Sequence, residues 1–271
     1  MRYLLALLLG LFTVPAYAEG PAVSALNGKL SVESGVSSAF GRSSAVGTLQ
    51  GAIAAPLGHS FGVELDAFAS TSHAAFAGGG LAQFFWRDPA FGQVGPFAGL
   101  AGSSGARLAL VGGMGELFGR NVTLQGFGGW LDVTGSGPRP GVYGSLYGGR
   151  LTLYPDPDLA VSLGAALAVG RASGTARVEY LPAFTPRRNV SFFVAAGAGD
   201  GQSYRVTGGI RLYFGPTKPL IRRHREDDPS LDDVMTAMYN PMSYPHPTYP
   251  TYDPYSCYAM PECYPGYVPP P

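Results

Sequence analysis

The chain has 271 residues, among them 40 Gly and 24 Pro, and its formal net charge is zero. Charged residues make up 13% and aromatic residues 12%, a balance that excludes disorder over the whole length, and glycine without a period of three excludes collagen. Because there is no excess of positive charge, we expect no nucleic-acid partner.

The first 18 residues predict a cleaved signal peptide. Arg2 precedes an apolar run at 4–12 that is too short to span a bilayer as a helix. Ala16-Tyr17-Ala18 then matches the small-x-small pattern that signal peptidase cuts, so the mature protein would begin at Glu19. A buried N-terminal strand and an uncleaved anchor are the alternatives. We therefore expect an exported protein.

Cysteine usage and hydropathy narrow the fold to two classes. The two cysteines, Cys257 and Cys263, are too few for a small secreted domain stapled by disulfides. After the signal peptide no stretch offers about 18 uninterrupted apolar residues, so we expect no transmembrane helix. An exported chain that is rich in glycine and poor in charge fits an outer-membrane β-barrel or a secreted β-sandwich.

Residues 19–215 have the period-two pattern of strands with two chemically different faces. Between Phe61 and Ala67, apolar residues occupy every second position. Short turns are expected after even-numbered strands and longer loops after odd-numbered ones. The connection at 182–188 is the exception, because it follows an even-numbered strand and is nevertheless long. The pattern predicts an all-β fold, a transmembrane antiparallel up-and-down β-barrel. It has about twelve strands, with ten as the alternative count, near 25–36, 44–56, 61–70, 74–86, 91–101, 106–118, 122–131, 141–154, 159–169, 175–181, 189–196 and 203–214.

The cost of placing charge in lipid predicts which strand faces line the lumen. An Arg or Lys that faces the middle of the bilayer costs about 2–4 kcal/mol, so the charged faces should point inward. Glu33 and Arg205 should be neighbours if the first and last strands pair. The 141–154 segment is expected to switch parity between Tyr147 and Arg150 through a bulge at Gly148-Gly149. The residues expected in the lumen, whose mixed signs predict little ion selectivity, are Lys29, Glu33, Glu64, Asp66, Arg107, Arg150, Arg177, Glu179, Arg205 and Arg211.

The polar strand faces disfavour a soluble sandwich. A wet outer face carries many charged side chains, which also protect edge strands. Here the polar faces are mostly Ser, Thr, Gln and Gly, and Lys29 and Lys218 are the two lysines of the whole chain. The barrel is therefore favoured.

The end of the last predicted strand resembles an assembly signal. Residues 207–214 have a polar-x-Gly-x-x-apolar-x-aromatic pattern, similar to the terminal β-signal that the outer-membrane assembly machinery reads. Thr207, Gly209, Leu212 and Phe214 carry the pattern. The departure from the usual form is that 57 residues follow Phe214.

Two stretches carry a wider resemblance. Phe-Trp-Arg-Asp-Pro at 85–89, and the run at 209–216 that leads into 220–229, resemble the small porin-like outer-membrane β-barrel proteins of Gram-negative bacteria, and among these the alphaproteobacterial type. The resemblance covers most of residues 19–230. It implies a barrel in contact with outer-membrane lipid and lipopolysaccharide, built by the outer-membrane assembly machinery, and it brings no catalytic residues.

Residues 216–271 are predicted to form a periplasmic tail. Ser230 begins a capping-box-like Ser-Leu-Asp-Asp, and Leu231, Val234 and Met235 share a helical face, which predicts a short helix near 230–239. The charged run before it is interpreted as solvated, with docking at the periplasmic rim as the alternative.

The rest of the tail is rich in Pro and Tyr. Residues 241–271 contain ten Pro and seven Tyr, which predicts a disordered linker, with contact to a periplasmic partner or the cell wall as the alternative. Cys257 and Cys263 can form a small-loop disulfide in an oxidising compartment, and an intermolecular bond or free thiols are the alternatives.

Catalytic groups are scarce. A lipid-acting hydrolase needs a Ser–His pair with an acid, or a His–Asp arrangement that activates water. The one credible candidate is His73, in a short loop, with Asp66 on the preceding strand. No nucleophile elbow, Walker loop, dinucleotide fingerprint or zinc spacing occurs, so we expect no cofactor and no metal. The sequence favours a structural barrel or a passive small-solute channel over a lipid-acting hydrolase or a barrel anchor whose tail binds a partner.

Overall fold

The computed structural model describes most of the chain that follows the expected signal peptide. The described residues are 20–39, 42–72, 75–103, 105–135, 142–185, 188–200, 203–227, 231, 232 and 234–236. The signal peptide, His73 and the tail from residue 237 onward, with Cys257 and Cys263, lie outside the described residues.

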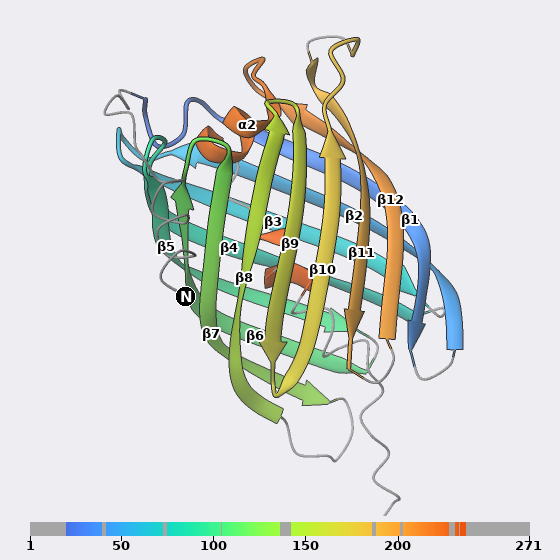
Figure 1. The fold of residues 1–271 in the computed structure, drawn as a ribbon. Coiled ribbons are helices and arrows are strands. Elements are labelled where there is room, and N and C mark those ends of the chain that lie inside the picture. The colour runs from blue at the N-terminus through green and yellow to red at the C-terminus, as the bar shows by residue number, and fades with distance from the viewer. Residues whose placement is uncertain are drawn as a thin grey trace, which may run out of the picture.

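Antiparallel strands form a closed barrel (Figure 1). Each strand pairs with its neighbour in sequence, and β1 also pairs with β12, so the predicted twelve-strand barrel is confirmed. The strands are β1 (Asn27–Ala39), β2 (Arg42–Pro56), β3 (Phe61–Ser72), β4 (Ala75–Asp88), β5 (Gly92–Ser103), β6 (Ala106–Phe118), β7 (Val122–Gly135), β8 (Val142–Asp156), β9 (Leu159–Ala168), β10 (Arg171–Tyr180), β11 (Val190–Gly199) and β12 (Ser203–Phe214).

The first and last strands close the barrel. Their register runs from Gly28 opposite Phe214 to Ser38 opposite Tyr204. In lipid, each backbone N–H and C=O group needs a partner within the protein, and closure removes the two open edges of the sheet. The ladder therefore ends at Phe214, next to the boundary expected at Gly215.

The loops after odd-numbered strands are shorter than expected. β1 continues to Ala39 and β2 begins at Arg42, so most of the connection at 37–43 between the first two expected strands is itself strand. Gly35 pairs with Val46, and Ser37 pairs with Ser44. Ser and Gly lower strand propensity but do not remove ladder donors, so the pairing continues through them. The connection between Tyr180 and Val190 is long, as the sequence indicates.

Strand β8 keeps one parity throughout, so the expected switch at Gly148-Gly149 was wrong. Tyr147 is exposed on the outer face, and Arg150 lines an interior cavity. These residues lie three positions apart, and in an unbroken strand such residues point to opposite faces. The register between β7 and β8 is continuous here, and the shift in the β8–β9 pair lies between Leu153 and Asp156.

The outer face of the barrel is apolar. Leu65, Val111 and Leu163 are 58–62% exposed, and Phe61 and Phe84 stack with their ring centroids 5.5 Å apart. A contiguous apolar surface of this size is not found on soluble monomers, and it matches the lipid-facing band of a membrane barrel. Other exposed apolar side chains of this face include Leu30, Val32, Leu49, Ile53, Leu100, Trp130, Val178, Val194 and Ile210.

The lumen wall has an apolar side and a polar side. From β4 to β8 the inward side chains include Leu81, Phe97, Leu110 and Leu131, which belong to one buried apolar cluster. Charged side chains also point inward, namely Lys29, Glu179 and Arg211 on β1, β10 and β12, and Glu116 and Arg150 on β6 and β8. An element that fills this lumen must therefore be amphipathic.

Part of the C-terminal tail is that element. Helix α2 (Leu220–Glu226) lies at one mouth of the barrel, and a helical turn at 234–236 lies deeper between the walls (orange-red in Figure 1). The helical turn falls within the range 230–239 in which the sequence predicts a short helix. Helix α2 instead forms in the charged run before it, which was interpreted as solvated. None of the helices in the described part of the chain is long and apolar enough to cross a membrane.

The burial of described tail residues corrects the interpretation of the tail as a segment that lies wholly outside the barrel. Leu220, Leu231 and Val234 are fully buried. Each such side chain gains about 1.5–3 kcal/mol by leaving water, and the apolar side of the lumen gives the last two the surface they need. Leu231 and Val234 therefore pack inside the barrel, and Leu220 packs at its mouth.

Candidate functional site

Helix α2 lies at the mouth at which the even-numbered strands end. The backbone N–H of Leu220 donates to Asp158 Oδ1 at 3.2 Å, and that of Ile221 donates to the Pro157 carbonyl at 3.0 Å, both in the β8–β9 turn. Further along the helix, Arg225 Nη2 donates to the Val122 carbonyl at 2.9 Å, where β7 begins. The helix therefore contacts two neighbouring turns of this mouth, β6–β7 and β8–β9.

An ion-pair cluster ties the start of the tail to the chain segment before β1. Lys218 Nζ lies 2.8 Å from Asp227 Oδ1 and 2.9 Å from Glu226 Oε2, and the Ser24 hydroxyl donates to Asp227 Oδ1 at 2.6 Å. Burial alone would raise the pKa of Glu226, but hydrogen bonds from Arg222 and Lys218 stabilise the carboxylate and lower its pKa overall. Both ends of the barrel domain are thus fixed at this mouth.

His224 carries the contact from α2 into the lumen. Its Nδ1 lies 3.1 Å from the Tyr154 hydroxyl, and its Nε2 lies 3.2 Å from the Tyr213 hydroxyl. Tyr213 in turn donates to Glu179 Oε1 at 2.7 Å. One chain of hydrogen bonds therefore links the helix at the mouth to a charged residue of the wall.

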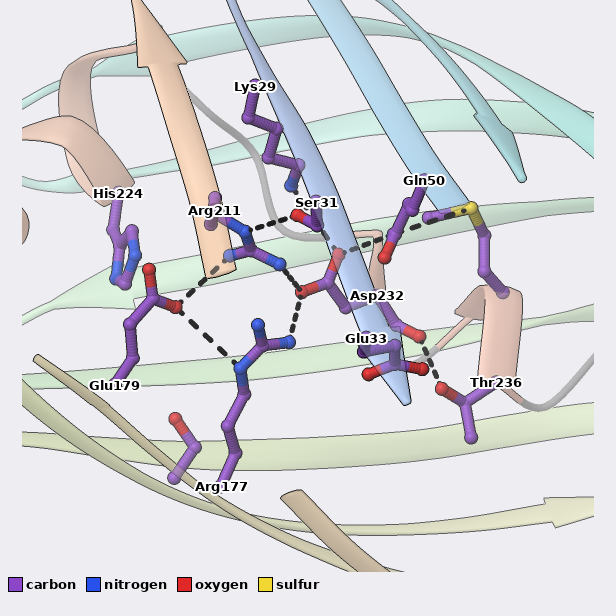
Figure 2. A network of polar contacts seen from close by, with 12 residues as sticks. Lys29, Ser31, Glu33, Gln50, Arg177, Glu179, Arg211, His224, Asp232 and Thr236 are labelled. Carbon is purple, nitrogen blue, oxygen red and sulfur yellow. Dashed lines mark hydrogen bonds and ion pairs between the residues drawn. The ribbon is translucent and has the colours of Figure 1, made fainter. Parts of the chain in front are cut away.

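Asp232 lies at the centre of the polar side of the lumen (Figure 2). Arg177 Nη1 and Arg211 Nη2 each lie 3.0 Å from Asp232 Oδ2. Gln50 Nε2 lies 2.9 Å and Lys29 Nζ 3.4 Å from Asp232 Oδ1. We call these four donors, Lys29, Gln50, Arg177 and Arg211, the Asp232 cradle.

Wall residues hold the two arginines of the cradle in place. Arg211 donates to Ser31 Oγ at 2.8 Å and to Glu179 Oε2 at 3.1 Å. The Arg177 guanidinium stacks on the Phe193 ring, 3.9 Å from its centroid. Ser191 donates to Glu179 Oε1 at 2.6 Å and so fixes that carboxylate as well. The arginines therefore keep partners that do not belong to the tail.

The opposite face of the tail segment packs on the apolar wall. Leu231, Val234 and Met235 are at most 5% exposed and join the cluster that contains Leu110 and Leu131. The apolar side chains of the segment thus contact the apolar wall, and Asp232 on its other face contacts the charged strands. Beside it remains a polar cavity of about 30 Å³, large enough for about one or two waters, lined in part by Glu116, Gln125, Arg150, Glu179, His224 and Asp232.

Nine of the ten charged residues expected in the lumen are on inward-facing positions. Glu33 and Arg205 form the expected ion pair, and Thr207 donates to Glu33 as well. The inward-facing residues are Lys29, Glu33, Glu64, Asp66, Arg150, Arg177, Glu179, Arg205 and Arg211.

Arg107 is the exception. In β6 the buried positions are Ala106, Leu108 and Leu110, so Arg107 lies on the outer face. It is the second residue of the strand, and near the interfaces an outward Arg costs about 0–1 kcal/mol. The expectation for this residue was wrong because Arg107 and the inward-facing Glu116 lie nine positions apart on β6, so the two charged side chains point to opposite faces.

The residues of the predicted assembly signal divide between the two faces. Thr207 and Gly209 lie on inward positions of β12, and Leu212 and Phe214 lie on outward ones. Their role in assembly stays a prediction.

Several polar residues of the interior were missed. Arg87 is 1% exposed and donates to Gln93 at 2.8 Å and to the Ala22 carbonyl at 3.0 Å, although its sequence context predicts a turn. Gln125 donates to Glu116 at 2.8 Å on the inner face of β6 and β7. Glu116 and Gln125 follow the inward parity of their strands, so that parity is the signal that could have found them.

No catalytic centre emerges in the part of the chain that the structure describes. Asp66 is buried on the inner face of β3, and its candidate partner His73 lies outside the described residues. The described residues contain no group of three or more His, Cys, Asp or Glu side chains that could hold a metal ion.

A closed twelve-strand antiparallel barrel with an apolar outer face and a charged interior is the fold of outer-membrane β-barrels of the porin type. Among solved structures, the chain is similar to the KdgM porin, with a TM-score of 0.51 and 10% identity over 67% of this chain and 98% of that one. No family model matches the chain. No curated protein matches it either.

Two further structures are similar at lower scores. One is the COG4313 outer membrane channel from Pseudomonas putida F1, with a TM-score of 0.46 and 12% identity over 74% of this chain and 99% of that one. The other is the Salmonella typhi outer membrane phospholipase, with a TM-score of 0.46 and 11% identity over 72% of this chain and 92% of that one. At such identities the likeness concerns the fold alone, and the alphaproteobacterial type stays a prediction.

Proposed function

We propose that this protein is an integral outer-membrane barrel that forms a channel for small solutes, closed by its own C-terminal segment. The observation that carries the proposal is the packing of tail residues 231, 232, 234 and 235 in the lumen through non-covalent contacts. A barrel with a purely structural role can fill its interior with side chains of its own wall. Here a separate segment fills it instead, and such a segment can leave.

The energetics of the tail segment support a closed state that can open. Its apolar contacts involve few side chains, chiefly Leu220, Leu231 and Val234. Its polar contacts are ion pairs with wall residues that keep other partners, such as Arg211 with Glu179. Undocking would therefore cost a moderate free energy and leave the strand ladder intact.

The lumen that such opening would expose is charged with both signs. The ion pairs of the wall include Glu33 with Arg205 and Glu179 with Arg211. The likeness of the fold to a porin supports the same class of function. The outer membrane is accordingly the proposed location, with the assembly machinery, lipid and lipopolysaccharide as partners.

Single-channel recording on the full chain tests the channel. We expect rare openings for the wild type and openings about tenfold or more frequent for the double variant Leu231→Asn, Val234→Asn, because two buried contacts with the apolar wall are lost. Leu57→Asn, in an exposed turn at the same mouth, is the matched control. If the double variant shows the heat-dependent gel shift of a folded barrel but conducts no more than the wild type, the channel is excluded and a structural barrel remains.

A further inference from the structure

The Asp232 cradle has the form of a binding site whose ligand is a carboxylate. Each carboxylate oxygen is contacted by two donors: Oδ2 by the two arginines at 3.0 Å, and Oδ1 by Gln50 at 2.9 Å and Lys29 at 3.4 Å. The donors come from β1, β2, β10 and β12, and the Asp232 carboxylate comes from the tail (Figure 2). Charge-assisted hydrogen bonds of this kind are about twice as strong as neutral ones.

The two arginines of the cradle have partners on the wall besides Asp232. Ser31 and Glu179 hold Arg211, and the Phe193 ring supports Arg177. Such second partners fix the direction in which each guanidinium points, as they do in preorganised binding sites. The two arginines should therefore keep their geometry when Asp232 leaves.

The local charge favours an anion whenever the tail segment is undocked. Lys29, Arg177 and Arg211 bring three positive charges to this layer, and Glu179 is the wall carboxylate that contacts the two arginines. With Asp232 docked, these three cationic side chains are at most 14% exposed. When Asp232 leaves, these groups carry two positive charges in excess, so an anion from solution would be drawn to the vacated position.

We propose that the Asp232 cradle is a carboxylate-binding site of the lumen, that Asp232 is its tethered ligand, and that a solute bearing a carboxylate exchanges with Asp232 when the channel opens. The exchange is non-covalent, and one carboxylate replaces another on the same four donors. Its last step rests on the proposed channel, whereas the binding site itself does not. The charges of the wall are thus segregated, so the weak ion selectivity expected from their near balance is replaced by a preference for carboxylates.

A chemical-rescue experiment on the full chain tests the site. Asp232→Ala removes one carboxylate and leaves the space of a formate ion beside the cradle. We expect formate to raise the melting temperature of the purified variant by about 2–4 °C at about five times its dissociation constant. The wild type, whose site is occupied, should gain no more from formate than from chloride at equal ionic strength. Asp232→Ser, which leaves similar space, serves if the Ala variant does not fold.

Three controls separate the cradle from bulk effects. Formamide has the shape of formate without its charge and should give no rescue. The double variant Arg177→Met, Asp232→Ala lacks one donor and should lose at least half of the formate effect. Equal rescue by chloride, or by formate in the double variant, would overturn the site, and stronger rescue by phosphate would overturn its assignment to carboxylates.

Single-channel currents test the exchange. Malonate should increase wild-type openings, malonamide should not, and Asp232→Ala should open frequently without either. The melting experiment does not depend on conduction, so a rescue by formate in a protein that never conducts keeps the site and rejects the channel. Openings that ignore malonate in a protein rescued by formate keep both the channel and the site but reject the exchange.

Discussion

Gly209 shows how a missing side chain shapes the polar wall at the scale of single residues. It lies on the inner face of β12 under the Phe193 ring, and a Cβ there would come within 2.5 Å of both Phe193 Cζ and the Val32 carbonyl oxygen. The ring that needs this space also carries the Arg177 guanidinium. The glycine of the predicted assembly signal therefore has a packing role of its own.

We expect Gly209→Ala to destabilise the barrel by about 1–3 kcal/mol through overpacking. Gly208→Ala is the matched control, because its nearest neighbour, the Phe193 carbonyl oxygen, is 3.7 Å from the added Cβ and the position faces outward. The measurement is the temperature at which each purified variant loses its gel shift. Equal temperatures for the two variants would contradict the packing role.

Arg107 shows where residue-scale inference from the sequence fails. The rule that charged faces point inward holds for residues near the middle of a strand, such as Glu33 and Arg177. It fails at a strand end, where an Arg can reach the polar interface. It also assumes a polar lumen, and β6 lines the side where Leu108 and Leu110 face inward. No local pattern could reveal that the lumen has an apolar side, since the tail that covers it lies more than 100 residues away in sequence.

At the scale of elements, the strands were largely predictable and the docking of the tail was not. Period-two alternation gave the twelve strands, and the end of the ladder at Phe214 followed from the aromatic terminus of the last one. The helical face of Leu231, Val234 and Met235 was also visible in the sequence. The surface that this face packs against was not visible in the sequence. An amphipathic helix has the same pattern whether its apolar face is covered by a partner protein, a membrane or its own barrel.

Helix α2 yields a prediction at this scale. Leu220 is fully buried in a cluster with Tyr154, Leu181 and Tyr213. Leu220→Ala should weaken the docking of α2 by about 2–5 kcal/mol and thereby speed tryptic cleavage at the arginines of this helix. Leu57→Ala, an exposed leucine in the β2–β3 turn, should change the docking free energy by less than about 0.5 kcal/mol.

Limited trypsin digestion of the purified protein measures the effect, with the C-terminal fragment followed by mass. Arg222 and Arg225 provide cleavage sites in both variants. If Leu220→Ala is cleaved as slowly as Leu57→Ala, then α2 is held by its polar contacts, such as Arg225 with the Val122 carbonyl, rather than by its apolar ones.

At the scale of the whole molecule, closure of the barrel depends on the strand ladder, whereas the tail contributes by covering apolar residues of the wall. All twelve ladders lie between Asn27 and Phe214. The tail adds no ladder bond but covers apolar wall residues such as Leu110 and Leu131. The barrel should thus be able to close without the tail, although the lumen would then expose apolar surface to water, at about 25 cal/mol per Å².

Two truncations distinguish the contribution of the strand ladder from that of the tail. A stop after Pro216 leaves every strand pair in place, so we expect a barrel that assembles and shows the heat-dependent gel shift, with a lower melting temperature than the full chain because the apolar wall is wetted. A stop before Thr207 removes the residues that pair β12 with β1 from Gly28 to Gly35 and with β11 from Val190 to Ala195. That second chain would carry unpaired backbone groups into lipid, so it should fail to assemble and be degraded in the periplasm. If the first truncation fails as well, barrel closure depends on the docking of the tail. The tail is then part of the folding unit, and the domain boundary expected at Gly215 is wrong.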